Sequence, residues 1–487
     1  MPPPERGRNV NRRPPQRRRT PPPRTPDIPR RVAYDLLSAV RERGAYANLT
    51  LPGLLGNAGL DDRDAALATE LSYGTVRWQG TLDAILAASL DRPLSELDPP
   101  VLDVLRLGAY QILHTRIPPY AAVAATVNLA GTVVGEGPAR LVNAVLRKVT
   151  KRDLEAWIIQ LTSPKRSDRT AETEIAELAL RHAHPEWIVR AIAAALGPEI
   201  AELGQALAAN NERPIVHLVA RRIDRDELSA QVGGEPGPWS PYAVRIPGGS
   251  PHSFAEVRDR RAGVQDEGSQ LMAIALAATL GGAGLPSGGS DNAGSNGWWL
   301  DLCAGPGGKA ALLDLLAPDG VQILAADRAP HRSQLVAQTI RGERVDIGRV
   351  RVISADGLAP PWRDNFADRV LVDAPCSGLG ALRRRPDARW RRTPQDVTDL
   401  VELQRGLLAA GLAAARSGGV VAYVTCSPHP AETVEIVEWA LAHGGATALD
   451  ARSALPDVPS LGPGPFVQLW PHRHGTDAMF LALLKVS

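Results

Sequence analysis

The chain has 487 residues with 44% hydrophobic content, which indicates a largely globular protein of two to four domains. Its 55 basic and 53 acidic residues leave a formal net charge of +2, so any affinity for nucleic acid must come from local patches. The three cysteines lack metal-ligand spacing, and no apolar run approaches the roughly 20 residues of a membrane helix, so we expect a cytoplasmic protein with no metal and no membrane span.

The N-terminal tail, residues 1–29, is rich in Pro and Arg and has almost no large apolar side chains, so we expect it to be disordered. Its arginines could hold phosphates by charge alone, and a purely solubilising tail is the alternative. Residues 30–150 show helical patterns throughout and should form an all-helical domain with its own core. Asp61 and Asp62 are N-cap candidates for a helix over 65–76, and further helices are expected over 82–90, 101–113, 121–134 and 139–149.

Three further segments complete the expected domain organisation. Residues 151–170 are polar and charged, and we interpret them as a linker. Residues 171–260 begin with helical patterns and then turn strand-like, which favours a small α+β module. Residues 261–487 form the last domain, in which the Gly/Ser/Asn-rich run 281–297 is expected to be a flexible insertion.

After this insertion, strand and helix patterns alternate along the chain. Such alternation with nearly continuous apolar strands predicts an α/β domain with a parallel sheet covered on both faces. The expected strands are 298–302, 321–327, 350–356, 369–374, 419–425 and 478–486, and the expected helices are 308–317, 331–341, 396–415 and 432–443.

A glycine-rich turn, Asp301–Lys309, joins the first of these strands to the first helix. Glycines let the backbone approach a ligand closely, and the helix start offers unpaired amides to a carboxylate or phosphate. Asp327 follows Gly307 by 20 residues, at the end of the next strand, where a carboxylate can accept both ribose hydroxyls. The spacing predicts an adenosine-containing cofactor, whereas the side chain of Cys303 in the turn is expected to act as a small hydrophobe.

Two cysteines stand where strands give way to turns. Cys376 follows the strand 369–374, and Cys426 follows the strand 419–425. Because ligands bind at the carboxyl ends of strands in open α/β sheets, both thiols and Asp373 should meet beside the cofactor. A thiolate that adds to carbon 6 of cytosine makes carbon 5 nucleophilic, and Asp373 could hydrogen-bond the ring edge as charge develops there.

Several motifs resemble those of the Sun/Fmu family of RNA cytosine-5 methyltransferases. In the C-terminal part they are Gly263–Gln270, Asp301–Lys309, Asp356-Gly357, Asp373–Gly378 and Thr425–Ser427. In the N-terminal part, Gly44–Leu49 and Arg63–Trp78 are similar to the NusB-like helical extension of the bacterial small-subunit rRNA members.

This resemblance implies a class I (Rossmann-like) methyltransferase domain that uses S-adenosyl-L-methionine, and a NusB-like RNA-binding domain. It assigns the attack to Cys426 and product release to Cys376. DNA cytosine methyltransferases use a Pro-Cys block for the nucleophile, so Cys376 would attack under that rival interpretation, but the second cysteine and the helical extension favour RNA. Lys309 lines the site by resemblance, with a surface lysine as the alternative. The cofactor-binding residues are then Cys303, Ala304, Gly305, Pro306, Gly307, Gly308, Lys309, Asp327, Arg332, Asp356, Gly357 and Asp373.

Two features depart from the family pattern. The Thr-Cys-Ser block is followed by Pro430-Ala431-Glu432-Thr433 in place of Pro-Glu-Glu-Asn, so a polar contact is expected to be absent or replaced. The insertion 281–297 is also unusual, although a loop there is accommodated at low cost.

An arginine-rich run, 383–392, follows the Cys376 block. We interpret Arg383, Arg384, Arg385 and Trp390 as an RNA clamp, in which arginines hold phosphates and the tryptophan stacks on a base. A solvated loop is the alternative. A clamp would be useful because the target base must leave its stack to reach the thiol.

These features together predict methylation of a cytosine at carbon 5 in 16S rRNA through a covalent cysteine adduct. We expect a monomer that acts on naked or early-assembly RNA. The same chemistry on tRNA is one alternative. A non-catalytic RNA-binding regulator is the other, and the intact glycine turn, Asp327 and both strand-end cysteines argue against it.

Overall fold

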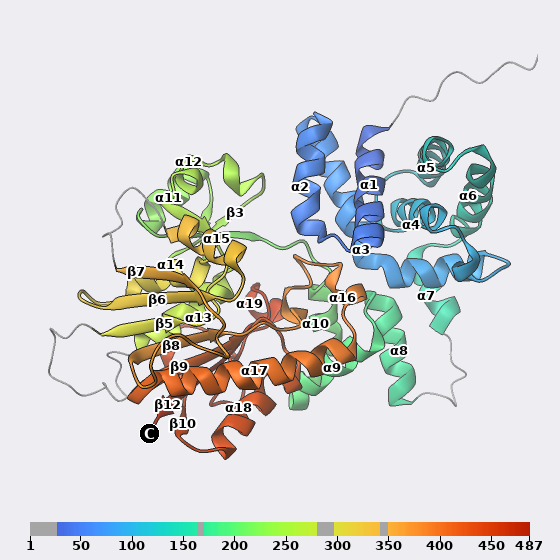
Figure 1. The fold of residues 1–487 in the computed structure, drawn as a ribbon. Helices are drawn as coiled ribbons and strands as arrows, with labels where there is room; N and C mark the ends of the chain where they lie inside the picture. The colour runs from blue at the N-terminus through green and yellow to red at the C-terminus, as the bar shows by residue number, and fades with distance from the viewer. Residues whose placement is uncertain (1–26, 163–169, 280–296, 341–348) are drawn as a thin grey trace, which may run out of the picture.

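The computed structural model describes residues 27–162, 170–279, 297–340 and 349–487. Most of the predicted tail, the charged centre of the predicted linker and nearly all of the predicted insertion lie outside the described residues. Figure 1 shows a helical N-terminal domain beside a larger body that contains two sheets.

Residues 27–162 contain helices and no strand, which confirms the predicted all-helical domain. Helix α1 begins where the Asp27 carboxylate caps the amide of Arg30, and it ends at Gly44, which has a φ of 57°. The apolar faces enclose a core that includes Leu105 and Leu146. The helices are α1 (Ile28–Arg43), α2 (Ala47–Ala58), α3 (Asp62–Ser89), α4 (Pro99–His114), α5 (Pro119–Val133), α6 (Glu136–Val149) and α7 (Leu154–Thr162), with a 3-10 turn, η1, at Leu94–Glu96.

Helix α3 is continuous where the sequence predicts two helices, over 65–76 and 82–90. Asp61 caps its start, as expected, by accepting from the amide of Asp64 at 2.8 Å. Gly80 lies between the two predicted helices but does not end the helix. A Cβ at this position would lie 2.4 Å from the ring of Trp390, so the glycine makes room for a distant side chain.

The middle of the chain forms a group of helices and a separate small sheet. Helices α8 (Ala171–His182), α9 (Glu186–Leu196) and α10 (Leu203–Ala209), with η3 (Gly197–Glu202), pack against side chains of the C-terminal domain such as Leu382 and Trp470. A four-stranded antiparallel sheet follows in the order β2-β3-β1-β4. Its elements are β1 (Val216–Ala220), α11 (Arg225–Val232), β2 (Glu235–Pro236), β3 (Ala243–Ile246), η4 (Pro251–Ser253), α12 (Ala255–Arg258) and β4 (Ala262–Val264). Because β4 pairs with β1, the small sheet extends across the boundary that the sequence suggests at 260.

The large sheet has the strand order β10-β12-β9-β8-β5-β6-β7, and β11 pairs with β12. Strands β7, β6, β5, β8 and β9 are parallel to one another. At one side β12 pairs antiparallel with β9, and β10 pairs antiparallel with β12. This arrangement confirms the predicted α/β class. The strands are β5 (Trp298–Asp301), β6 (Gln322–Asp327), β7 (Val350–Ser354), β8 (Ala367–Asp373), β9 (Ala415–Thr425), β10 (Ala446–Leu449), β11 (Val467–Gln468) and β12 (Phe480–Val486).

Helices cover both faces of this sheet, as its apolar strands require. On one face, α13 (Glu267–Ala278) and α14 (Gly308–Leu316) share a core with Trp299 and Leu371. On the other face, α17 (Pro394–Ala414) and α18 (Val434–Ala442) share a core with Val370 and Tyr423. The remaining elements are α15 (Pro330–Ile340), η5 (Leu379–Ala381), α16 (Ala388–Arg391), η6 (Pro430–Glu432), η7 (Ala451–Ala454) and α19 (Pro471–His474).

No helix among the described residues is both long and apolar enough to pass through a membrane. In the same residues, no group of three or more His, Cys, Asp or Glu side chains is placed to hold a metal ion.

Candidate active site

A cleft of about 490 Å³ opens where β5, β6, β7, β8 and β9 end. The strand order reverses between β5 and β8, which is the position where open α/β sheets bind ligands. A larger hollow of about 820 Å³ lies on α5 and α6 of the N-terminal domain, but no acid, cysteine or histidine lines it. We therefore place the chemistry in the smaller cleft, whose lining includes the predicted residues Cys303, Asp327, Arg332, Asp356, Gly357, Asp373, Cys376, Arg385 and Cys426.

The glycine turn between β5 and α14 is packed tightly against the end of β6. Gly307 has a φ of 106°, a conformation that favours glycine. A Cβ on Gly305 would lie 2.5 Å from both the Asp327 carboxylate and the Arg332 guanidinium, so there is no room for a side chain at this position. Ala304, Pro306 and Gly308 complete the turn, and α14 starts at Gly308.

Asp327 is held at the end of β6 by three contacts. Its Oδ2 accepts from the backbone amide of Gly305 at 3.1 Å and pairs with Arg332 at 3.1 Å, and its Oδ1 accepts from the amide of Ala329 at 2.9 Å. The carboxylate is thereby fixed at the edge of the cleft with a cation beside it. An incoming hydroxyl pair would find acceptor oxygens already oriented.

An apolar wall lies beside this carboxylate. Leu302, Leu403 and Leu407 line the cleft next to Asp356 and Gly357. A Cβ on Gly357 would approach a methyl of Leu407 to 2.9 Å, so the absence of a side chain lets this wall close. Leucine side chains with a carboxylate beside them are a suitable environment for a flat ring such as adenine.

Lys309 and Asp373 form a buried ion pair, with 2.7 Å between Nζ and Oδ2. The lysine side chain is 11% exposed, so it is not the surface lysine that the sequence leaves as an alternative. Burial acts to lower the pKa of Lys309, but the Asp373 carboxylate raises it above its ordinary value. The ammonium group is therefore charged and close enough to Cys426 for the two groups to affect each other's pKa.

The Sγ atoms of Cys376 and Cys426 lie 3.4 Å apart. The hydrogen bond between the thiols, together with burial, raises the pKa of Cys376 well above its ordinary value. The same hydrogen bond lowers the pKa of Cys426 against the opposing effect of burial, and Lys309 adds to the lowering. The pair thus favours a thiolate on Cys426 and a proton on Cys376. By contrast, burial raises the pKa of Cys303, as expected for a cysteine that acts as a small hydrophobe.

Glu432 links the loops that carry the two cysteines, a role that the sequence analysis did not foresee. Its fully buried carboxylate accepts from the backbone amide of Ser377 at 2.7 Å and from the hydroxyl of Ser427 at 2.6 Å. Gln404 donates to the same carboxylate at 3.1 Å and to the Pro375 carbonyl at 2.9 Å. The only sequence signal was that Glu432 keeps its place in the altered Pro-Ala-Glu-Thr run.

The arginines after Cys376 make contacts inside the protein. Arg383 is 3% exposed and donates to the carbonyl of Gly475 at 2.9 Å. Arg384 binds Asp266 at 2.6 Å and Asp477 at 3.1 Å. Both guanidinium groups are therefore engaged with partners in the protein.

Two neighbouring side chains connect the same run to other parts of the chain. The indole of Trp390 donates to the Val76 carbonyl of α3 at 2.7 Å. Arg389 is completely buried and donates to the Ala183 carbonyl at 3.0 Å and to Asn211 Oδ1 at 2.8 Å. These contacts join the loop after Cys376 to the N-terminal domain and to the helices α8 to α10.

The predicted RNA clamp is therefore wrong for Arg383, Arg384 and Trp390. The run is rich in arginine because buried backbone carbonyls and carboxylates need donors, and only the folded chain shows where those acceptors are. Arg385 alone among the four lines the cleft. Cleft residues that the sequence did not assign to the site include Tyr46, Arg328, Arg392, Leu403 and Leu407.

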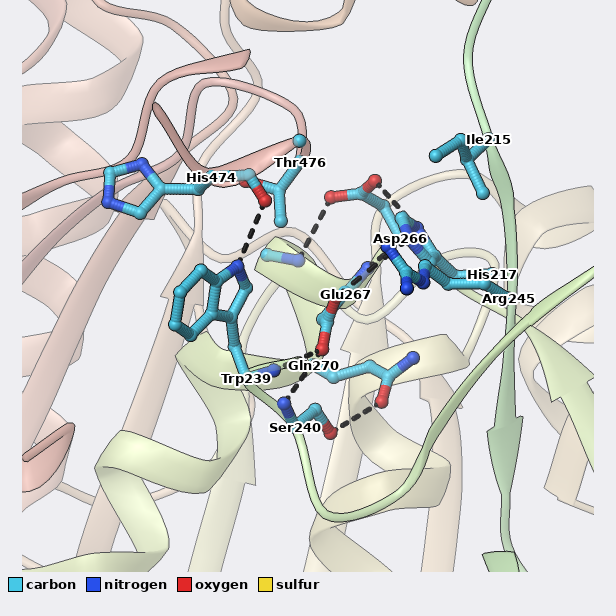
Figure 2. Close-up of polar contacts among 12 residues, drawn as sticks. Ile215, His217, Trp239, Ser240, Arg245, Asp266, Glu267, Gln270, His474 and Thr476 are labelled. Atoms are coloured by element: carbon cyan, nitrogen blue, oxygen red, sulfur yellow. Dashed lines mark hydrogen bonds and ion pairs between the residues drawn. The ribbon is translucent and has the colours of Figure 1, made fainter. Parts of the chain in front are cut away.

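Buried polar contacts fix the start of α13 (Figure 2). The Glu267 carboxylate accepts from the amides of Trp239 at 2.7 Å and Ser240 at 2.8 Å, and the Trp239 indole donates to the His474 carbonyl at 2.9 Å. These contacts tie the small sheet, α13 and the segment before β12 together. The side-chain amide of Gln270 also donates to the carbonyl of Gln265, which precedes α13, at 3.0 Å.

Gln265 offers a test of whether the site fits a cofactor. Its side-chain Oε1 is buried and has no hydrogen-bond partner among the described residues. A Cβ on Gly308 would lie 3.5 Å from its amide carbon, so this unsatisfied acceptor stands next to the glycine turn. Gln265 is not among the residues that line the cleft, but its free acceptor stands behind the turn at the cleft's edge. Asp327 and the leucine wall give the cleft itself the acceptors and the apolar surface that an adenosine-containing ligand requires.

Comparisons with known proteins agree with this geometry. Residues 292–485 match the family described as 16S rRNA methyltransferase RsmB/F, and residues 27–151 match the NusB family. A protein of Mycobacterium tuberculosis, named only as a methyltransferase, is 50% identical over 94% of this chain and 96% of its own length. Ribosomal RNA small subunit methyltransferase B of Pseudomonas syringae pv. tomato is 33% identical over 94% of this chain and 97% of its own length.

Two crystal structures share the fold. The structure of PH0851 has a TM-score of 0.74 at 20% identity and covers 95% of this chain and 99% of its own. The structure of NSun6 from Pyrococcus horikoshii, solved with SFG, has a TM-score of 0.51 at 17% identity and covers 63% of this chain and 99% of its own.

Proposed function

Because the chain belongs to the RsmB/F family of 16S rRNA methyltransferases, we propose that it methylates carbon 5 of a cytosine in 16S rRNA through a covalent cysteine adduct. S-Adenosyl-L-methionine would supply the methyl group. The observation that carries this proposal is the pair of thiols, 3.4 Å apart, at the ends of the neighbouring strands β8 and β9 and in the same cleft as Asp327.

We assign cofactor binding to the residues around the glycine turn. Asp327 would accept the ribose hydroxyls, and the leucine wall beside Asp356 and Gly357 would hold the adenine. The remaining turn residues, with Arg332 and Gln265, would surround the methionine end. The relative from Pyrococcus horikoshii was solved with SFG, an S-adenosylmethionine analogue, which supports the same ligand class here.

Cys426 is the proposed nucleophile. Its lowered pKa and the adjacent Lys309 ammonium favour a thiolate, which adds to carbon 6 of cytosine. The electron pair displaced from the ring moves towards carbon 5, which then accepts the methyl group. Asp373, oriented by Lys309, would contact the ring edge while that charge develops.

Cys376 is the proposed partner for product release. After methylation, carbon 5 still bears a proton, and its removal restores the double bond and expels the Cys426 thiolate. Cys376 lies 3.4 Å from Cys426 and lines the open cleft, so its thiol would first give its proton to solvent water. The resulting thiolate would then take the proton from carbon 5. Under the alternative derived from DNA methyltransferases, Cys376 would attack, but the raised pKa of Cys376 makes it the poorer nucleophile of the two.

Two single substitutions separate these roles. Cys376→Ala should accumulate a covalent protein–RNA adduct that survives a denaturing gel, because the methylated product cannot leave. Cys426→Ala should form no adduct and no 5-methylcytosine. The reverse pattern, with the adduct lost in Cys376→Ala and trapped in Cys426→Ala, would overturn the assignment.

The RNA target is the second point to test. A NusB-like domain and relatives named for the small subunit support 16S rRNA, in naked or early-assembly form, and such a reaction would take place in the cytoplasm with the enzyme as a monomer. Labelled S-adenosylmethionine should mark purified 16S rRNA, and nuclease mapping should place the label on one cytosine. Labelling of tRNA instead would favour the tRNA alternative, and failure to bind the cofactor in calorimetry would favour a non-catalytic regulator.

A further inference from the structure

Tyr46, from the N-terminal domain, reaches the active-site cleft. It immediately precedes α2, is 41% exposed and lines the same cleft as Cys376 and Cys426. All the other groups assigned to the chemistry come from the C-terminal domain. The cleft is therefore complete only when both domains are in place.

Arg385 lies beside this tyrosine with its charge unmatched. Its guanidinium carbon is 5.2 Å from the centroid of the Tyr46 ring. The neighbouring Arg391, 4.3 Å from the same centroid, is paired with Asp387 at 3.4 Å. Among the described residues, no carboxylate lies within ion-pairing distance of Arg385. A cation that the protein has oriented but not neutralised indicates an anionic ligand.

The position of Arg385 favours RNA over the cofactor as the source of that anion. Arg385 lies near Gly378 and Cys376, on the β8 side of the cleft, whereas Asp327 and the glycine turn mark the cofactor side. A smaller hollow of about 150 Å³ has Tyr46, Arg385, Arg391 and Arg392 in its lining, together with Asp387 and Asp396. Asp387 pairs with Arg391 at 3.4 Å and Asp396 pairs with Arg392 at 3.6 Å, so Arg385 is the arginine of this hollow whose charge is left for a ligand. An unpaired guanidinium beside an aromatic ring is a combination that binds single-stranded nucleic acid.

We propose that Arg385 and Tyr46 form a subsite for the nucleotide next to the target cytosine. Arg385 binds its phosphate, and Tyr46 holds the guanidinium in place and presents the exposed part of its ring to the base or ribose. This inference rests on the proposed function, because it takes an RNA substrate as given. It makes the NusB-like domain part of the active site in addition to any RNA affinity of its own.

The first test replaces Arg385. Arg385→Ala should raise the KM for 16S rRNA about tenfold, with kcat within about twofold. The slope of log Kd for RNA against log salt should fall by about 0.7, the contribution of one phosphate contact on a single strand. Arg385→Lys keeps the charge and should restore the slope. Arg416→Ala removes an equal charge at the start of β9, at the opposite end of that strand from Cys426, and should leave KM and slope unchanged.

The second test replaces the tyrosine. Tyr46→Leu keeps an apolar side chain but removes the π face, and it should raise the KM for RNA. Tyr46→Phe keeps the ring and should lose less affinity than Tyr46→Leu. Affinity for S-adenosylmethionine should be the same in all these variants, which also shows that each one is folded.

The outcomes separate this inference from the proposed function. If the wild-type protein methylates 16S rRNA but Arg385→Ala behaves like Arg416→Ala, the subsite is wrong and the proposed function stands. A fall in kcat at unchanged KM would overturn the subsite too, because Arg385 would then act on the chemistry. If the wild-type protein methylates no rRNA, the proposed function fails, whatever the salt slopes show.

Discussion

Asp301 places a carboxyl group at the end of β5, completely buried beneath the cleft. Burial and the nearby Asp373 carboxylate raise the pKa of Asp301 to about 8, against the opposing effect of Lys309. The group is therefore neutral in the folded protein at pH values where it is ionised in the unfolded chain. Protonation favours the folded state.

This linkage predicts a pH dependence of stability. Between about pH 4 and pH 8 the folded protein keeps a proton on Asp301 that the unfolded chain has released. The stability that Asp301 contributes is therefore fully present below about pH 4 and is lost as the pH rises to about 8. Asp301→Asn, which is neutral throughout, should equal the wild type near pH 4 and exceed it by a few kcal/mol above pH 8. Urea unfolding at pH 5, 7 and 9 measures this difference.

A surface substitution controls for the change in net charge. Asp319→Asn, on the exposed turn between α14 and β6, removes the same charge away from the buried site. A constant difference between Asp301→Asn and the wild type at all three pH values would contradict the raised pKa.

Single residues show why part of the site was predictable. Asp327 and Asp373 are the last residues of strands, Cys426 directly follows a strand, and Cys376 lies three residues beyond one. Position at a strand end is a local property that the sequence pattern carries. Glu432 acts instead through Ser377, which is 55 residues away along the chain. No spacing in one sequence reveals that such a pair is in contact.

At the scale of elements, the run 383–392 acts as a connector. Trp390 hydrogen-bonds α3, while Arg389 bonds the ends of α8 and α10. A run of arginines in a sequence usually means a solvated surface or a phosphate site, and here most of it is internal. Buried donors of this kind are recognised only when the acceptors brought by other elements are known.

Gly80 allows this connection to be tested. Gly80→Ala should improve the helix propensity of α3 by up to about 1 kcal/mol, but its Cβ would lie 2.4 Å from the Trp390 ring. The ring cannot move aside without breaking its bond to the Val76 carbonyl. We therefore expect a net loss of about 1–3 kcal/mol in the free energy of unfolding, measured by urea denaturation.

The matched control is a helix glycine with free space. In α2, a Cβ on Gly53 would meet nothing within 4 Å, so Gly53→Ala should be neutral or stabilising by up to about 1 kcal/mol. Equal effects of the two substitutions would mean that Trp390 does not restrain α3.

At the scale of the whole molecule, local patterns predicted the helical N-terminal domain and the large α/β sheet but not the contacts between them. Alternating strands and helices specify the large sheet, and helical periodicity specifies the N-terminal domain, because both signals lie within short windows. Tyr46 and Cys376 line the same cleft, although they are more than 300 positions apart in the chain. The complete substrate cleft is thus a product of tertiary structure.

Cofactor binding should stabilise the folded protein against heat. A ligand that binds only the folded state at 100 times its Kd stabilises that state by about 2.7 kcal/mol. S-Adenosylmethionine should therefore raise the unfolding temperature. Asp327→Asn should lose most of this gain, because the amide presents one uncharged acceptor oxygen in place of the two oxygens of a carboxylate. Asp364→Asn, in an exposed loop before β8, serves as the control.

Because the run 383–392 joins the cleft to the N-terminal domain through buried contacts, the cofactor should shift a single calorimetric transition. A transition that stays at the same temperature with and without ligand, beside one that moves, would show that the N-terminal domain unfolds independently and that its contacts with the cleft are weak.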